Sequence, residues 1–370
     1  MFRRLMCMSF CFSLIASATA QNYRRVVPPT GPVGPRSYVE PRRYSTQAPS
    51  TVSAAAPTRT GPEILTRPTL IRSSGSYQLG GNIYAATDAT TAAIVIAAPD
   101  VTLDLGGFTV VGRGATAPDA GGVAILADRI TVRNGSITSF DSENQCAVMV
   151  SAGVRAFVLT DLKISHCDTG ILLNPDNNDD NPVVGGRIDR CAVDEGSVGI
   201  LAFASQGVSL QNCVVSGAAA KRQVPGEGSG MLLRGSSFIV DGCNMTGNTH
   251  GMRLDADFSL VRACSLSSNR NTGAYITGKG NRLEDCVISG NGITGATVLG
   301  ENNAFVNDHF SGNGGHGLSL DKSGPTGANH TYIRDCAVMG NAAEGISDKG
   351  LGDTRIEGGF PATPAPGVSR

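Results

Sequence analysis

Tryptophan is absent from this 370-residue chain, and charged residues make up only 16% of it. Segments with the 3.6-residue periodicity of amphipathic helices are nearly missing, which excludes a body built from helical repeats. After residue 20, no apolar run approaches the roughly 20 residues that a membrane-spanning helix needs. Glycine, by contrast, is abundant at 48 residues, and this composition is typical of a β-rich body with many tight turns.

A repeat is visible between residues 248 and 317. One glycine recurs every 22 residues, at Gly251, Gly273, Gly295 and Gly317. One asparagine recurs at spacings of 21, 22 and 22 residues, at Asn248, Asn269, Asn291 and Asn313. A fixed period in the twenties indicates a solenoid in which each repeat is one coil. We expect the asparagines to occupy left-handed turns and to form a ladder of amide hydrogen bonds along the axis.

Each repeat contains three short segments in which apolar and polar residues alternate, and this pattern predicts three strands per coil. Comparable segments begin near Ser76. Coils stacked in register pair every backbone N–H and C=O with the coils above and below, at about 4.8 Å per coil. We therefore predict an all-β fold, a single-stranded parallel β-helix of about 11 to 12 coils.

The stretch GSYQLGGNIYA, followed by IVIAAPDVTLDLGGFTVVG, resembles the opening coil of secreted bacterial β-helix proteins of the pectate-lyase-like superfamily. The resemblance covers residues 73–358 and implies a right-handed parallel β-helix. It does not select one function, because this fold is shared by lyases, hydrolases, epimerases, adhesins and proteins without known activity. The Asp-Pro-His motif of mannuronan epimerases is absent, as is the paired-aspartate motif of polygalacturonase-like hydrolases.

The two ends of the chain differ from the repeats. Residues 1–20 have two arginines, an apolar run and Ala18-Thr19-Ala20, the layout of a secretory signal cleaved after Ala20. Residues 21–72 contain nine of the 18 prolines and predict a disordered linker, either a spacer or a cationic arm that touches an anionic envelope polymer. Residues 359–370 predict a flexible tail. We expect a secreted or periplasmic protein.

The charge is distributed unevenly along the chain. Residues 21–72 carry eight arginines against two glutamates, whereas residues 73–370 carry 20 basic and 29 acidic residues. An acidic body behind a basic arm does not match the pattern of nucleic-acid-binding proteins. The partner that we expect is a polysaccharide or another polymer of the cell envelope.

Eight cysteines follow the predicted signal. Six occupy the same place in their repeats, at the start of the third strand, namely Cys191, Cys213, Cys243, Cys264, Cys286 and Cys336. We assign His309 to that place in the one intervening coil, whereas Cys146 and Cys167 lie elsewhere. We interpret the six as an interior column of small apolar thiols, because side chains about 4.8 Å apart are too widely spaced for relaxed disulfides.

Insertions interrupt the period at residues 174–182, 218–228 and 322–330, and loops of this kind can form the walls of a cleft. The first insertion contains Asp176, Asp179 and Asp180. Ca²⁺ prefers several oxygen ligands, so these carboxylates are candidates for a calcium site. An Asp/Asn-rich run is also typical of a solvated turn, and the glycine and terminal glutamate of an EF-hand are missing.

The first strand of each repeat points alternate residues outward, where they are free to serve a function. Polar residues occur there or beside it at His250, Arg253, Asp255, Tyr275, His316 and Asp321. Tyrosine or histidine for proton transfer and arginine for binding a carboxylate suit proton abstraction next to a uronate carboxyl. Three functions remain open: a lyase-like or epimerase-like protein acting on an acidic polysaccharide, a non-catalytic envelope-binding or structural protein, and a periplasmic metal-handling protein.

Overall fold

The computed structural model describes residues 61–114, 120–177, 179–221, 226–322, 327–349 and 353–358. The chain divides into two units, Met1–Gly61 and Pro62–Arg370, and the second unit contains all the described strands. The predicted signal, residues 21–60 of the predicted linker and the predicted tail lie outside the described residues. No helix long and apolar enough to cross a membrane occurs in the described part of the chain.

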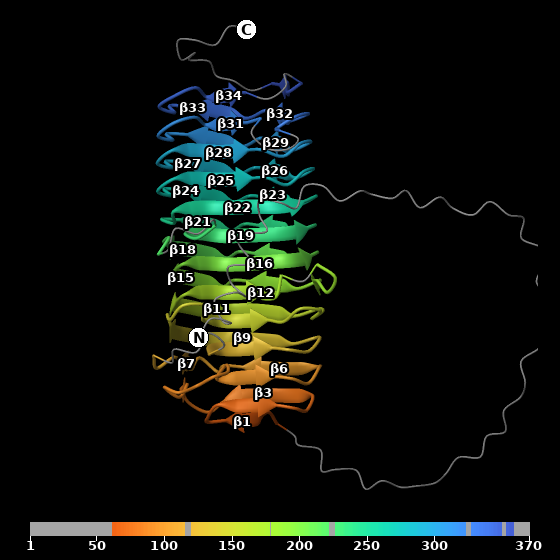
Figure 1. Cartoon of the computed structure of the whole chain (residues 1–370), viewed down its shortest axis with the longest axis vertical. Helices are drawn as coiled ribbons and strands as arrows, with labels where there is room; N and C mark the ends of the chain where they lie inside the picture. The colour runs from red at the N-terminus through yellow and green to blue at the C-terminus, as the bar shows by residue number, and fades with distance from the viewer. Residues whose placement is uncertain are drawn as a thin grey trace, which may run out of the picture. The chain divides into compact units, whose positions relative to one another are not determined.

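The described residues between 62 and 358 form a parallel β-helix in which the coils stack one above another (Figure 1). Sheet I is the 13-stranded sheet, and it contains β2 (Thr69–Ile71), β5 (Ile94–Ile96), β8 (Gly121–Ile125), β10 (Cys146–Val150), β12 (Thr169–Leu173), β16 (Val198–Gln206), β19 (Ser229–Ser236), β22 (His250–Asp257), β25 (Thr272–Ile276), β28 (Thr294–Val298), β31 (Leu318–Leu320), β34 (Ile346–Asp348) and, beside β16, β13 (Val183–Val184).

The 22-stranded sheet consists of two stacks that share β9 (Thr131–Phe140) and β11 (Val158–Cys167). The second-strand stack also contains β1 (Glu63–Leu65), β3 (Gly75–Leu79), β6 (Val101–Asp104), β14 (Arg187–Asp189), β17 (Ser209–Gln211), β20 (Ile239–Asp241), β23 (Leu260–Arg262), β26 (Arg282–Glu284), β29 (Ala304–Val306), β32 (Tyr332–Arg334) and β35 (Arg355–Glu357). The third-strand stack contains β4 (Ile83–Tyr84), β7 (Thr109–Val111), β15 (Ala192–Gly196), β18 (Val214–Ala218), β21 (Asn244–Thr246), β24 (Ser265–Ser267), β27 (Val287–Ser289), β30 (His309–Ser311) and β33 (Ala337–Met339).

The predicted parallel β-helix of about 11 to 12 coils with three strands per coil is confirmed. The first strand begins at Glu63, ten residues before the predicted start at 73. Inward residues of all three stacks meet in one continuous apolar core. In the second-strand stack, for example, one inward column consists of fully buried residues, Val240, Val261, Leu283 and Phe305. Such stacking buries an apolar residue in every coil without any loss of backbone hydrogen bonds.

The chain turns between the second and third strands at a single residue in the left-handed region. These corner residues have φ between 48° and 63° and are Arg190, Asn212, Gly242, Ala263, Asp285, Asn307 and Asp335. The next side chain points into the crowded corner, where only a compact group fits. It is a cysteine at six corners, and each of these cysteines is at most 2% exposed. The predicted column of free thiols is therefore confirmed in the structure.

The assignment of His309 to this column is wrong. The register pairs His309 with Val287, which lies one residue after Cys286, so Asp308 occupies the corner instead. Asp308 is 1% exposed, whereas His309 is only partly buried on the outer surface. A carboxyl group thus replaces a thiol in the coil between Cys286 and Cys336.

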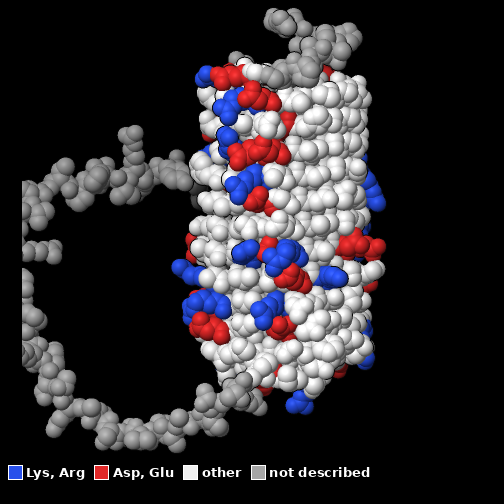
Figure 2. Space-filling model, turned by 180° about the vertical axis from the view of Figure 1, so that it is seen from behind, with Lys and Arg blue, Asp and Glu red and all other residues white. Residues whose placement is uncertain are grey.

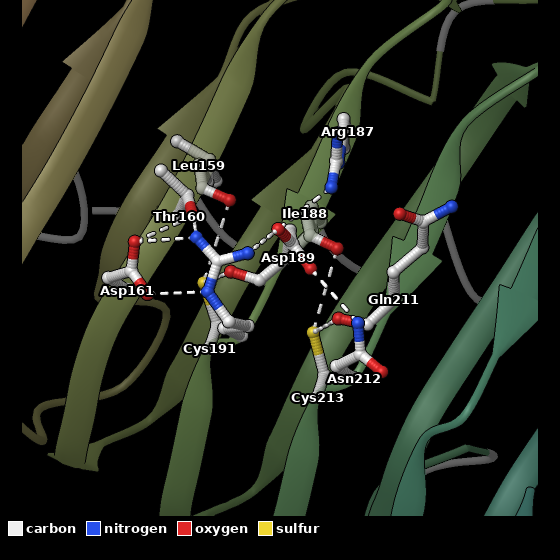
Figure 3. A network of polar contacts seen from close by, with 11 residues as sticks. Leu159, Thr160, Asp161, Arg187, Ile188, Asp189, Cys191, Gln211, Asn212 and Cys213 are labelled. Atoms are coloured by element: carbon white, nitrogen blue, oxygen red, sulfur yellow. Dashed lines mark hydrogen bonds and ion pairs between the residues drawn. The ribbon is translucent and has the colours of Figure 1, made fainter.

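The outer side of one corner carries a network of ion pairs (Figure 3). Nε and Nη2 of Arg190 each donate a hydrogen bond of 2.8 Å to the carboxylate of Asp161 in the preceding coil. Arg190 also contacts Asp189, and Arg187 donates a 2.8 Å hydrogen bond to the same carboxylate. On the inner side, the Cys191 thiol lies among backbone carbonyl groups. The corner therefore separates paired charges outside from neutral groups inside.

The predicted asparagine ladder is confirmed. Asn248, Asn269, Asn291 and Asn313 are at most 1% exposed, and each donates a side-chain hydrogen bond to the amide oxygen of the asparagine in the next coil, ending at Asn341. The expected left-handed conformation is wrong for these asparagines, because it belongs to the residue before each of them, such as Ser268 or Gly290. The left-handed residue makes the turn, and the asparagine that follows points inward.

Charged side chains gather along one side of the face shown in Figure 2, while much of the remaining face is uncharged. On the second-strand stack, partly exposed side chains form ion pairs, such as Arg262 with Asp241 at 2.7 Å and Arg282 with Glu284 at 2.6 Å. Exposed pairs of this kind contribute little to stability. They do neutralise one another, so this side presents no strong field to a charged partner.

Candidate functional site

Three successive strands of sheet I, β19, β22 and β25, position the candidate site. The register aligns Leu232 with Arg253 and Arg253 with Tyr275, while Ser229 aligns with His250. Inward neighbours such as Met252 and Leu254 are fully buried, so the alternating side chains of Arg253 and Tyr275 share the outer face. The sequence pattern predicted this shared face.

Arg253 is held in place by two contacts. Its Nε donates hydrogen bonds of 3.0 and 2.8 Å to the two carboxylate oxygens of Asp255, and its guanidinium lies 5.2 Å from the ring centre of Tyr275. Asp255 also accepts a 2.6 Å hydrogen bond from the Thr277 hydroxyl. Among the described residues, the two terminal nitrogens of Arg253 have no hydrogen-bond partner. The guanidinium of Arg253 is therefore held in one orientation. Its terminal nitrogens can still donate the two parallel hydrogen bonds with which arginine binds a carboxylate.

Two buried polar atoms without partners lie beside Arg253. His250 is half-buried, and its Nδ1 makes no hydrogen bond within the described residues. The hydroxyl of Ser229, a fully buried residue in register with His250, also lacks a partner among them. Buried polar atoms are normally satisfied by protein, water or ligand. Both atoms can therefore hydrogen-bond to water or to a polar group of a ligand.

Burial lowers the pKa of His250 below its usual value of 6.5, and the positive charge of Arg253 lowers that pKa further. The imidazole is therefore neutral at neutral pH. A neutral imidazole has one nitrogen free to accept a proton, which is the state that a general base requires.

These residues surround a shallow pocket of about 80 Å³ lined by Gly226, Ser229, His250, Arg253 and Tyr275. A pocket of this size holds several water molecules or a small polar group of a ligand. Its mouth is open, so a larger ligand could direct one group inward toward His250 and Arg253.

His316 and Asp321 do not belong to this pocket. They occupy the same positions in their coil as His250 and Asp255 occupy in theirs, but three coils farther along sheet I. At about 4.8 Å per coil, this places them roughly 14 Å away. His316 lies instead 3.9 Å from the carboxylate of Glu344. The structure therefore brings together four of the six candidates, His250, Arg253, Asp255 and Tyr275.

The three candidate calcium ligands, Asp176, Asp179 and Asp180, are exposed in the turn after β12. In the described ranges, no group of three or more histidine, cysteine, aspartate or glutamate residues has an arrangement that could hold a metal ion. The structure therefore does not assemble these carboxylates into a coordination site.

Ser229 and Gly226 line the pocket but were not candidates in the sequence. The signal that could have found them is the interruption of the period at residues 218–228, directly before β19. Gly226 contributes one wall from that loop, as expected for an insertion beside a cleft, while residues 222–225 lie outside the described part. None of the described residues of the 174–182 loop lines the pocket.

A family model described as a right-handed β-helix region matches residues 146–304 and 229–352. The chain belongs to the right-handed β-helix family. The resemblance seen in the opening coil is thereby confirmed at the level of the fold.

Two solved structures share this β-helix at low sequence identity. The A-module of a mannuronan C-5 epimerase from Azotobacter vinelandii matches with a TM-score of 0.58 and 13% identity, covering 79% of this chain and 91% of the module. A double mutant of a periplasmic alginate epimerase matches with a TM-score of 0.56 and 12% identity, covering 78% of each chain. No curated protein sequence matches the chain. At such identities the similarity shows the fold alone.

Proposed function

We propose that this β-helix protein acts on an acidic polysaccharide at the outer face of sheet I. The observation that supports the proposal most directly is the state of Arg253, which Asp255 fixes through Nε, while its terminal nitrogens have no hydrogen-bond partner among the described residues. A uronate carboxylate bound by those nitrogens would lie beside His250 and Tyr275, which line the same pocket. Two structurally similar proteins are epimerases of uronate polymers, which is consistent with this assignment by analogy.

The chemistry that suits these groups is removal of the proton on the carbon next to the carboxylate. Neutral His250 accepts this proton, and Arg253 stabilises the negative charge that develops on the carboxylate. In a lyase, the electron pair then forms a carbon–carbon double bond, the neighbouring glycosidic C–O bond breaks, and Tyr275 protonates the departing oxygen. In an epimerase, Tyr275 returns a proton to the same carbon from the opposite face.

One assay covers both reactions. The purified protein is incubated with polyuronates in D₂O, with ultraviolet absorbance reporting the new double bond and NMR reporting deuterium at the carbon next to the carboxylate. We expect one of these signals, and we expect Y275F and R253K to abolish it. Absence of both signals with polymannuronate, polyguluronate and polygalacturonate would overturn the catalytic proposal.

The orientation of Arg253 favours a second candidate function, a non-catalytic polysaccharide-binding protein. A fixed guanidinium can recognise a carboxylate without transforming it. Binding of a polyuronate that R253K weakens, with neither double-bond formation nor deuterium exchange, would support this alternative over the enzyme.

We also propose that the protein is exported. The arginines, apolar run and Ala18-Thr19-Ala20 of residues 1–20 support this location. One of the structurally similar epimerases is periplasmic. Mass spectrometry of the protein from fractionated cells should find a mature form that begins at Gln21, whereas an intact Met1 in the cytoplasmic fraction would contradict export.

A further inference from the structure

The outer face of sheet I changes character at the pocket. The central outward position is apolar in seven consecutive coils, at Leu70, Val95, Ala124, Met149, Leu172, Leu201 and Leu232. The same position is polar in the next five, at Arg253, Tyr275, Thr297, Ser319 and Ser347. We call the first seven residues the apolar column. The strands of sheet I can be traced in Figure 1 from β12 to β34, and the apolar column ends at β19.

The apolar column is on the outside of the coil. Leu172 lies between Ile171 and Leu173, which are buried in the core, yet Leu172 itself is partly exposed. Leu70 is 44% exposed, Val95, Met149 and Leu201 are partly exposed, and Ala124 and Leu232 are only 4% and 7% exposed. The outer face of a sheet that meets water usually carries polar residues at such positions. An apolar outer face that is partly open to solvent indicates a site of interaction.

The apolar column ends beside the pocket. Leu232, the last residue of the column, is aligned directly with Arg253. Leu232 is itself 7% exposed, and Gly226, which lines the pocket, lies against it, because a Cβ atom there would be 3.0 Å from the Leu232 side chain. The partly exposed column from Leu201 toward the N-terminal coils therefore begins one coil beyond Leu232. Among the described residues, the terminal nitrogens of Arg253 and two buried polar atoms, on Ser229 and His250, lack hydrogen-bond partners.

We propose that this surface binds an anionic amphiphile, an acidic saccharide head attached to a single hydrocarbon chain. The head occupies the pocket, where Arg253 complements its charge, and the chain lies along the apolar column toward the N-terminal coils. The assignment of the head rests on the proposed function, whereas that of the chain rests on the apolar column alone. The proposed hydrocarbon chain narrows the substrate class from any acidic polysaccharide to an acidic saccharide that is lipid-linked or acylated.

The geometry specifies which residues contact the chain. Seven positions at about 4.8 Å per coil extend over roughly 29 Å. One hydrocarbon chain spans about half of a bilayer core, or roughly 15 Å. A chain that starts at Leu232 therefore covers Leu201 and Leu172 and ends near Met149. Leu70, at the far end of the same column, is beyond its reach and provides a matched control.

The test compares three probes by isothermal titration calorimetry below their critical micelle concentrations. Dodecyl glucuronide has both the acid and the chain, methyl glucuronide lacks the chain, and dodecyl maltoside lacks the acid. We expect dodecyl glucuronide to bind at least about tenfold more tightly than either of the others. We expect L201S to lower its affinity about tenfold without affecting methyl glucuronide, and L70S to have no effect.

Several results would overturn the inference. Equal affinities for dodecyl and methyl glucuronide would remove the chain site, and so would equal losses in L70S and L201S. A stable dimer that L201S dissociates would assign the apolar column to a second copy of this chain instead. Thermal melts confirm that each variant is folded, and L172S replaces L201S if the latter is not.

Parallel measurement of polyuronate turnover separates this inference from the proposed function. Turnover with no chain-dependent binding would overturn the amphiphile and leave the polysaccharide activity standing. Chain-dependent binding of dodecyl glucuronide without turnover would support the amphiphile and overturn catalysis. Equal binding of dodecyl maltoside and dodecyl glucuronide would overturn the acidic head, because the pocket would then not select a charge.

Discussion

The carboxylate of Asp308 accepts a 2.8 Å hydrogen bond from the backbone N–H of Cys286 in the preceding coil. Its second oxygen is buried and has no partner among the described residues. Burial is the main cause that raises the pKa of Asp308 from 3.8 to about 7. An ionisable group therefore sits inside the core at a corner where every neighbouring coil of the column has a neutral thiol.

The stability of the protein should depend on the ionisation of Asp308. Because the pKa is higher in the folded state, the folded state binds the proton more tightly, and this contribution to stability is lost as the pH rises from about 4 through 7. Between about pH 5 and 8 the wild type should lose on the order of 3 kcal/mol relative to D308N. Urea unfolding of both proteins across this range measures the difference.

The matched variant is D308C, which continues the thiol column. It should be more stable than the wild type at pH 8, with a smaller advantage at pH 5, where the wild-type carboxyl is largely protonated. A wild-type stability that follows that of D308N in parallel at every pH would show that Asp308 does not titrate in this window.

Substitution of one interior asparagine should weaken the β-helix severely. The Asn291 side chain donates to the carbonyl of Leu266 and to Asn313, and it accepts from the backbone and side chain of Asn269. N291A removes these bonds and leaves buried partners unsatisfied, so we expect a loss on the order of 3 to 5 kcal/mol in the free energy of unfolding. N341A, at the partly exposed end of the ladder, is the control and should cost much less. If N291A and N341A lost the same free energy of unfolding, burial of the asparagine would not explain the effect.

Activity on a polyuronate should depend on the pocket residues and not on their equivalents three coils away. H250Q should lower turnover by about 10² to 10⁴-fold, as expected for loss of a general base. H316Q occupies the same position in its own coil and should leave turnover unchanged. An equal effect of both substitutions would remove His250 from the mechanism.

The pH dependence of turnover gives a further test of His250. Its pKa is lowered by burial and by Arg253, so the neutral base persists below pH 6.5. Activity should therefore fall on the acid side only at a pH below 6.5, and kcat/KM measured across pH should show this limb. A limb at or above 6.5 would point to a different base.

The core cysteines should be unreactive in the native protein. Burial raises the pKa of Cys167 to about 12 and that of Cys336 to about 11, so these two thiols ionise little at neutral pH. All eight cysteines are buried, which keeps a reagent in solution from reaching them. Iodoacetamide should label none of the eight buried cysteines until the protein is unfolded, and mass spectrometry can locate each label. Peptides in which Cys213 is disulfide-linked to Cys243 would contradict the thiol column.

Much of the fold could be predicted because each coil of the solenoid has the same turns and the same buried positions, which restrict the residues that fit there. A glycine, an asparagine and a cysteine recur where each coil has the same crowded turn, so their spacing reports the period. Sorting alternate residues into inward and outward sets also placed Arg253 beside Tyr275. The first two strands were missed because each has only three residues within a stretch of prolines and arginines, too short to show alternation.

The errors occurred where the repeat itself varies. His309 was assigned to the cysteine column, but the buried Phe310 aligns with Ile288, and this apolar pair sets the register and places Asp308 in the corner. Ser229 and Gly226 follow an insertion, where counting from the previous coil no longer gives the position of a side chain. The change from an apolar to a polar outer column depends on the register of twelve coils and could not be read from any one of them.

Asp308 also has a mechanical consequence. Each coil touches only the coils next to it, so a β-helix comes apart at its weakest joint. Above pH 7, ionisation of the buried Asp308 weakens the joint between the coils of Cys286 and Cys336. The coils from β29 to the C-terminal end should then detach as one block while the coils that hold the pocket and the apolar column remain folded. At alkaline pH the coils from β29 onward would unfold, while the pocket and the apolar column would keep their folded structure.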